Sequence, residues 1–116
     1  MTLASQLGCL LDEDLDPALA GPLARHLEGW RVMSVHAEGW LGVKNGPLLE
    51  GMAEAKLRVL VTGDRLLYAQ RSGQLLAVRI GVVLVHEPAR AGERLDAIAT
   101  AVVRVRDGQL IEVARP

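Results

Sequence analysis

Acidic side chains crowd the point where the first apolar run of the chain ends. The stretch "CLLDEDLDP" places Asp12, Glu13, Asp14 and Asp16 directly after that run. Like charges this close repel one another, so the arrangement costs stability unless another group offsets it. A helix cap with solvated acids would explain the stretch, and so would half of a metal site.

A second acid, Asp64, follows the apolar run "RVLVT" after one glycine. Asp12 and Asp64 therefore both come just beyond segments that resemble buried strands. If those strands are neighbours in a parallel sheet, their ends lie about 5 Å apart. Two carboxylates so placed can share Mg²⁺, which lowers the pKa of a bound water and orients it for attack on a phosphodiester. The alternative is that Asp64 and Asp16 only cap the helices that follow them.

The apolar pattern predicts strands and helices in alternation. We expect strands at 8–11, 30–36, 58–62, 82–85 and 109–113, and helices at 17–28, 47–56, 64–73 and 91–105. Such alternation implies a single domain over residues 1–116, a three-layer α/β/α fold with a mainly parallel sheet of four or five strands. We expect the first strand to be central and the crossover connections to be right-handed. Ligands of such sheets bind at the carboxyl edge, where the strand order reverses.

The composition narrows the function classes. The chain of 116 residues carries a net charge of -1, so no overall basic field attracts nucleic acid. Any polyanion would have to be held by a local arginine cluster or by a metal ion. Cys9 is the only cysteine, and its apolar surroundings predict a core residue in a reducing compartment. The sequence shows no secretory signal and no run long enough to span a membrane, so we expect a cytoplasmic protein.

At these residues the sequence resembles the PIN-like nuclease group. The segments that carry the resemblance are "LLDEDLDPALAGPLARHLEGWRV", "LLEGMAEAKLRVLVTGDRLL" and "GVVLV", and it covers roughly residues 8–115. The nearest likeness is to a small bacterial PIN-like family of unknown function, similar to VapC-type toxin nucleases. Those nucleases cut RNA with Mg²⁺ or Mn²⁺ held by a few acids. The resemblance therefore implies a PIN-like fold and one of these two metal ions.

The resemblance also assigns roles to particular residues. It implies Asp12 and Asp64 as catalytic acids that bind the metal, with Glu13 and Asp14 as further ligands. A family acid is common near Asn45, and Glu50 is the nearest acid on the helix that follows, so we include Glu50 among the ligands.

The substrate contacts that we expect are Arg65, Asn45 and Thr62. The pattern departs from the family at two positions. Leu66 stands where a second aspartate is expected, and Leu67 stands where phenylalanine is expected.

Two functions remain open. The first is a metal-dependent ribonuclease, the toxin component of a toxin-antitoxin pair with a cognate antitoxin-like protein. The second is a catalytically degenerate PIN-like module that binds RNA or a protein partner. A third possibility, a phosphoacceptor receiver domain, needs a lysine after its last core strand. The only lysines here, Lys44 and Lys56, both precede Asp64, so we reject this possibility. We also expect a homodimer, because an exposed Trp40 and the apolar stretch 75–85 exceed what so small a fold buries.

Overall fold

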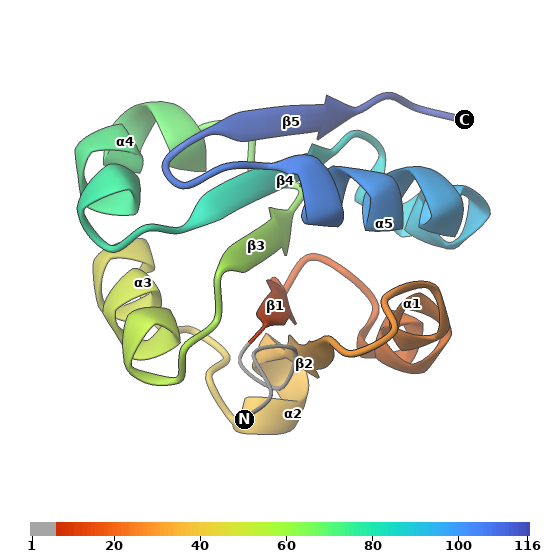
Figure 1. The fold of residues 1–116 in the computed structure, drawn as a ribbon, viewed down its shortest axis with the longest axis horizontal. Coiled ribbons are helices and arrows are strands. Elements are labelled where there is room, and N and C mark those ends of the chain that lie inside the picture. Colours follow the sequence, from red (N-terminus) through yellow and green to blue (C-terminus); the bar gives the residue numbers. More distant parts are fainter. Residues whose placement is uncertain (1–6) are drawn as a thin grey trace.

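The computed structural model, which describes residues 7–116, contains one sheet of five parallel strands (Figure 1). Hydrogen bonds join the strands in the order β2-β1-β3-β4-β5. This confirms the predicted parallel sheet and the predicted pairing of the first and third strands. The middle strand is β3 rather than β1, because two further strands, β4 and β5, join the sheet beyond β3. The strands are β1 (Gly8–Leu11), β2 (Arg31–Ser34), β3 (Val59–Thr62), β4 (Gly81–Val85) and β5 (Leu110–Val113).

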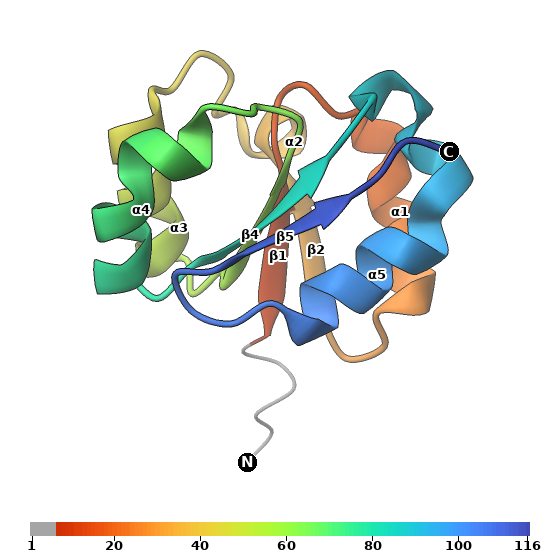
Figure 2. The same ribbon diagram turned by 90° about the horizontal axis from the view of Figure 1, so that it is seen from above.

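Helices cover both faces of the sheet, which gives the three layers seen in Figure 2. One face carries α1 (Ala20–His26) and α5 (Leu95–Arg104), and the other carries α3 (Asn45–Glu54) and α4 (Leu67–Ala77). The short α2 (Val35–Glu38) belongs to the α3 and α4 side through Val35. Two 3-10 helices, η2 (Pro17–Leu19) and η3 (Pro88–Arg94), lead into α1 and α5.

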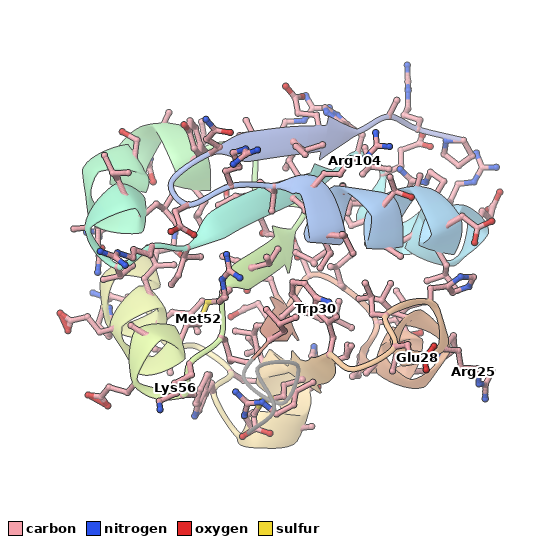
Figure 3. The ribbon with its side chains drawn as sticks, in the orientation of Figure 1. Arg25, Glu28, Trp30, Met52, Lys56 and Arg104 are labelled. Carbon is pink, nitrogen blue, oxygen red and sulfur yellow. The ribbon has the colours of Figure 1, made fainter. Side chains whose placement is uncertain are left out.

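Side chains of alternate strand residues build a separate core on each face. Cys9 and Leu11 of β1 pack on the α1 and α5 side, and Leu10 between them packs on the α3 and α4 side. Because helices cover both faces, the three inner strands β1, β3 and β4 are buried at every position rather than at every second one. Figure 3 labels one residue from each core, with Trp30 packed below α5 and the fully buried Met52 on α3.

One crossover connection has the opposite hand to the others. The connections through α3, α4 and α5 all step across the sheet toward β5, yet α3 and α4 cover one face while α5 covers the other. The connection through α1 steps in the reverse direction and also lies on the opposite face from α3 and α4. Because direction and face are both reversed, its hand is the same as that of the connections through α3 and α4. The expectation of uniformly right-handed crossovers is therefore wrong for α5. Since α1 reaches only part of its face, α5 is needed to bury the valines of β3 and β4 there. The chain enters this connection at Glu87, whose φ of 50° lies in the left-handed region.

Other details also differ from the sequence prediction. Helix α4 passes through Gly73 and ends at Ala77, because Leu75 is fully buried and holds the extra turn against the core. Trp40 is half-buried against the α3 side, about 4.0 Å from the Cβ position of Gly51. The apolar stretch 75–85 is also largely buried within the monomer, so neither feature calls for a dimer. Within residues 7–116, no helix combines the length and the apolar character that crossing a membrane requires.

Candidate functional site

The acids that follow β1, which are Asp12, Glu13 and Asp14, lie at the same edge of the sheet as Asp64, which follows β3. The amide of Asp12 continues the sheet by donating to the carbonyl oxygen of Val61 at 2.9 Å. In the order β2-β1-β3-β4-β5, the direction of chain progress across the sheet reverses between β1 and β3. Parallel α/β sheets bind ligands outside the strand ends at this switch point. The fold therefore places the acids where a ligand site is expected.

Asp12 is a buried carboxylate with both oxygens engaged. It is 7% exposed, its Oδ1 accepts the Glu13 amide at 2.8 Å, and its Oδ2 accepts the hydroxyl of Thr62 at 2.7 Å. Burial raises the pKa of Asp12 above its ordinary value, although these two hydrogen bonds oppose the rise. The charges of Glu13 and Asp64 add smaller increases to that pKa. The negative charge of Asp64 therefore acts on Asp12, although the two residues follow different strands.

Thr62 is the residue that ties the two acidic segments together. Its hydroxyl oxygen donates to Asp12 and accepts the amide of Asp64 at 3.0 Å. Thr62 is fully buried, so its hydroxyl is not available to a bound substrate. Thr62 therefore does not make the substrate contact that we expected, and instead holds Asp12 and Asp64 in position.

Asp14 reaches from the β1 loop to the β3 loop. Its Oδ2 accepts the amide of Gly63 at 2.9 Å. A Cβ atom at position 63 would lie 2.7 Å from that same oxygen and 2.7 Å from Cγ of Pro88, so glycine is needed for this approach. The pKa of Asp14 is raised, first by burial and further by the charge of Asp12, while the Gly63 hydrogen bond opposes the rise.

The capping interpretation is correct for Asp16 and partly correct for Asp64. Asp16 precedes η2 and accepts the amide of Ala18 at 2.9 Å, as an N-cap does. Asp64 Oδ1 accepts the amide of Leu66 at 2.9 Å, which stabilises the turn before α4. That contact occupies one carboxylate oxygen of Asp64 and leaves Oδ2 without a hydrogen bond from the described residues. Asp64 can therefore fix the turn and still act as a ligand.

Four further residues were predicted from the sequence to belong to this site. Glu13 faces the loop at 39–44, where its Oε1 accepts the Gly42 amide at 3.4 Å. Glu50 is exposed on α3, and its charge is not among those that raise the pKa of Asp12 or Asp14. Asn45 is the half-buried first residue of α3, and Arg65 is exposed directly after Asp64.

The donor set suits a hard cation held by few protein ligands. In residues 7–116, no three His, Cys, Asp or Glu side chains are grouped so that they could hold a metal ion together. Mg²⁺ and Mn²⁺ do not require such a cage, because Mg²⁺ typically keeps several waters and takes one or two carboxylates. Asp14 Oδ1 and Asp64 Oδ2 are the candidate ligand oxygens, since the other oxygen of each side chain already accepts a backbone amide.

One further polar pair lies at the same edge of the sheet, beyond β4 and β5. His86 Nε2 contacts Glu112 Oε1 at 2.7 Å, and the His86 amide donates to the carbonyl oxygen of Val113 at 3.0 Å. No spacing in the sequence indicates this pair, since its two members are 26 positions apart. Comparison with known protein families, with curated proteins and with solved structures finds no match to this chain.

Proposed function

We propose that the protein is a metal-dependent ribonuclease of PIN-like fold, the toxin component of a toxin-antitoxin pair, which acts in the cytoplasm. One observation carries the proposal: Asp12, Asp14 and Asp64 flank the switch point between β1 and β3, and the charges of Asp12 and Asp64 each raise the pKa of Asp14. Carboxylates that repel one another at a ligand-binding edge are stabilised by a shared divalent cation.

The chain supports this function through positioning. Asp14 and Asp64 would hold Mg²⁺ or Mn²⁺, and Thr62 would keep Asp12 and Asp64 in register. When bound, such a cation supplies a water of lowered pKa and stabilises charge on a phosphodiester. Arg65, exposed beside Asp64, would contact a phosphate of the RNA.

Cleavage of single-stranded RNA tests the proposal. The wild type should cut RNA with Mn²⁺ or Mg²⁺ and lose the activity in chelator. Asp12→Asn and Asp64→Asn should both be inactive, whereas Glu28→Gln, which removes an exposed acid at the end of α1, should cut RNA as the wild type does. Activity that survives in either aspartate variant would contradict the assignment.

A second candidate is a degenerate PIN-like module that binds RNA or an antitoxin-like protein without cutting. Leu66 favours it, because a 63% exposed leucine stands where the resemblance implies an acid. Leu41, at 55% exposure in the loop that contacts Glu13, adds a second exposed apolar side chain. Under this candidate the protein would bind RNA or its partner in chelator, and no metal would produce cleavage.

A further inference from the structure

A hollow of about 670 Å³ lies between α5 and β5, at the edge of the sheet away from β2. Its walls are largely apolar and come from Ala97 and Ala101 of α5 and from Ile111 and Val113 of β5. None of the acids at the ends of β1 and β3 lines this hollow.

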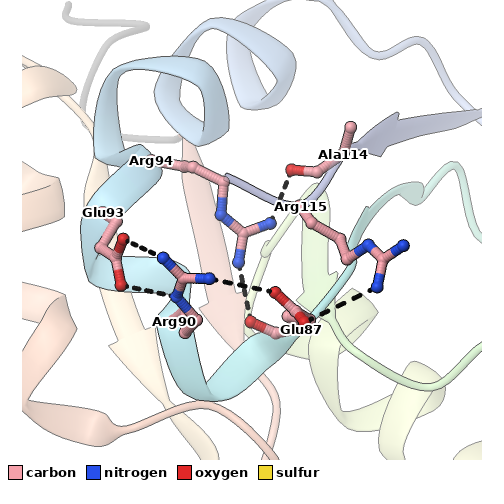
Figure 4. A network of polar contacts seen from close by, with 6 residues as sticks. All are labelled: Glu87, Arg90, Glu93, Arg94, Ala114 and Arg115. Atoms are coloured by element: carbon pink, nitrogen blue, oxygen red, sulfur yellow. Dashed lines mark hydrogen bonds and ion pairs between the residues drawn. The ribbon is translucent and has the colours of Figure 1, made fainter.

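Arg94, which lines the hollow, carries a buried charge that no carboxylate pairs. It is 8% exposed, and its two Nη atoms donate to the carbonyl oxygens of Ala114 at 2.8 Å and Glu87 at 2.7 Å (Figure 4). Within residues 7–116, no carboxylate lies at salt-bridge distance from Arg94, and its buried Nε has no hydrogen-bond partner. The nearby Glu93 is bound by Arg90 instead. A buried charge without a paired ion is costly, so an anion beside Arg94 would be stabilising.

Two further arginines line the same hollow. Arg115 follows β5, is exposed, and is loosely paired with Glu87 at 3.8 Å. Arg104 ends α5, and Figure 3 shows it beside β5. Arg104 lies ten positions after Arg94, which corresponds to about 15 Å along the helix axis. The positive charges therefore lie at both ends of the hollow.

Two acidic residues that line the hollow, Asp96 and Glu112, are each in contact with a histidine. Asp96 contacts Nδ1 of His26 at 3.0 Å, which draws its carboxylate toward α1 and away from β5. Glu112 contacts His86 at 2.7 Å, at the end of β4. The lining of the hollow therefore carries three arginines against two carboxylates, together with the hydroxyl of Thr100 and an apolar wall.

We propose that this hollow binds a phosphate oxyanion, with Arg94 and Arg115 at its main position and Arg104 contacting a second phosphate of the same ligand. Guanidinium groups bind phosphate oxygens through paired, charge-assisted hydrogen bonds. The hollow contains no aromatic side chain on which a base could stack, so the phosphate rather than the base is recognised. The site is separate from the proposed nuclease centre and does not depend on it.

Titration with inorganic phosphate at constant ionic strength in chloride, followed by backbone amide NMR in the presence of chelator, tests the proposal. We expect saturable shifts at Ala97, Thr100 and Val113. Arg115→Gln, at an exposed position, should weaken the affinity for inorganic phosphate about three- to fivefold, whereas Arg104→Gln should weaken only the binding of a longer ligand whose phosphates reach both ends of the hollow. Arg25→Gln is the matched control, because Arg25 is exposed on α1 and projects from the outer surface (Figure 3).

Two results would overturn the proposal. One is the absence of saturable shifts in this hollow at millimolar phosphate, and the other is an equal loss of affinity in Arg25→Gln. A single-stranded oligoribonucleotide identifies the source of the phosphate. If it binds more tightly than inorganic phosphate and depends on Arg104, the site takes a nucleic-acid backbone. If it binds no more tightly, the site takes a free phosphate compound.

Discussion

The hydroxyl of Thr62 donates to Oδ2 of Asp12 at 2.7 Å, which joins the carboxyl end of β3 to that of β1. The same hydroxyl oxygen accepts the amide of Asp64 at 3.0 Å. One buried side chain thus sets the relative positions of both acids. The geometry of the proposed metal centre therefore depends on Thr62, although the buried hydroxyl of Thr62 cannot contact a ligand.

Thr62→Val should therefore destabilise the protein in a pH-dependent manner. The substitution keeps the shape of the side chain but leaves a buried carboxylate oxygen without its donor, at a cost of about 1–3 kcal/mol at neutral pH. The cost should shrink at pH values where Asp12 is protonated, since the carboxyl group then has a hydrogen-bond donor of its own. Urea unfolding at a series of pH values measures both effects.

Thr62→Ser provides the control, because serine keeps the hydroxyl donor and loses only a methyl group. Its cost in unfolding free energy should be nearly independent of pH. If valine and serine show the same pH dependence, the hydrogen bond to Asp12 does not stabilise the charged carboxylate.

Gly63→Ala should destabilise the protein by about 1–3 kcal/mol through overpacking. A Cβ atom there would lie 2.7 Å from both Asp14 Oδ2 and Pro88 Cγ, so the two loops would have to separate. Gly21→Ala is the matched control, because position 21 is helical and has no atom within 4 Å of its Cβ position. It should stabilise the protein by about 0.5–1 kcal/mol. Thermal unfolding of the two variants compares them, and an equal effect at both positions would refute the contact.

The raised pKa of Asp12 predicts how its contribution to stability varies with pH. Burial favours the protonated form, so the folded state binds the proton more tightly than the unfolded state, whose pKa is about 3.9. This stabilising contribution is complete below the unfolded pKa and is lost as pH rises through the folded pKa. Relative to Asp12→Asn, the wild type should therefore lose stability as pH rises from about 4 toward neutrality. Denaturant unfolding without metal measures this difference. If the wild type instead gains stability relative to Asp12→Asn over that pH range, the hydrogen bonds to the Asp12 carboxylate outweigh the effect of its burial.

Cys9 should be unreactive in the folded protein. Burial raises the pKa of its thiol to about 12, so almost no thiolate exists at mildly alkaline pH. A thiol reagent such as dithionitrobenzoate should modify Cys9 only after denaturation. Fast modification under native conditions would show that the α1 face of β1 opens readily.

The sequence was sufficient to predict the parallel sheet and the meeting of Asp12 with Asp64. Both follow from apolar segments buried on two faces and from the rule that parallel strands end at one edge. Asp16 as a cap is equally local, because an acid followed by Pro17 defines a helix start.

The features that the sequence did not predict depend on contacts between distant segments. The placement of α5 on the α1 face follows from which valines remain uncovered, and a local pattern does not contain that information. The role of Thr62 arises from a hydrogen bond across 50 positions, whereas the family resemblance had led us to expect a substrate contact. The paired His86 and Glu112 likewise meet only because β4 and β5 are adjacent.

The central claim is that Asp14 and Asp64 share a divalent cation beside the buried Asp12, and thermal unfolding with Mn²⁺ against chelator tests it most directly. Millimolar Mn²⁺ should raise the Tm of the wild type and of Glu28→Gln, because a ligand that binds only the folded state stabilises it. Asp14→Asn and Asp64→Asn should lose most of that rise, since each removes a ligand oxygen and a charge. A wild type whose Tm does not respond to Mn²⁺, or an equal rise in all four proteins, would contradict the claim.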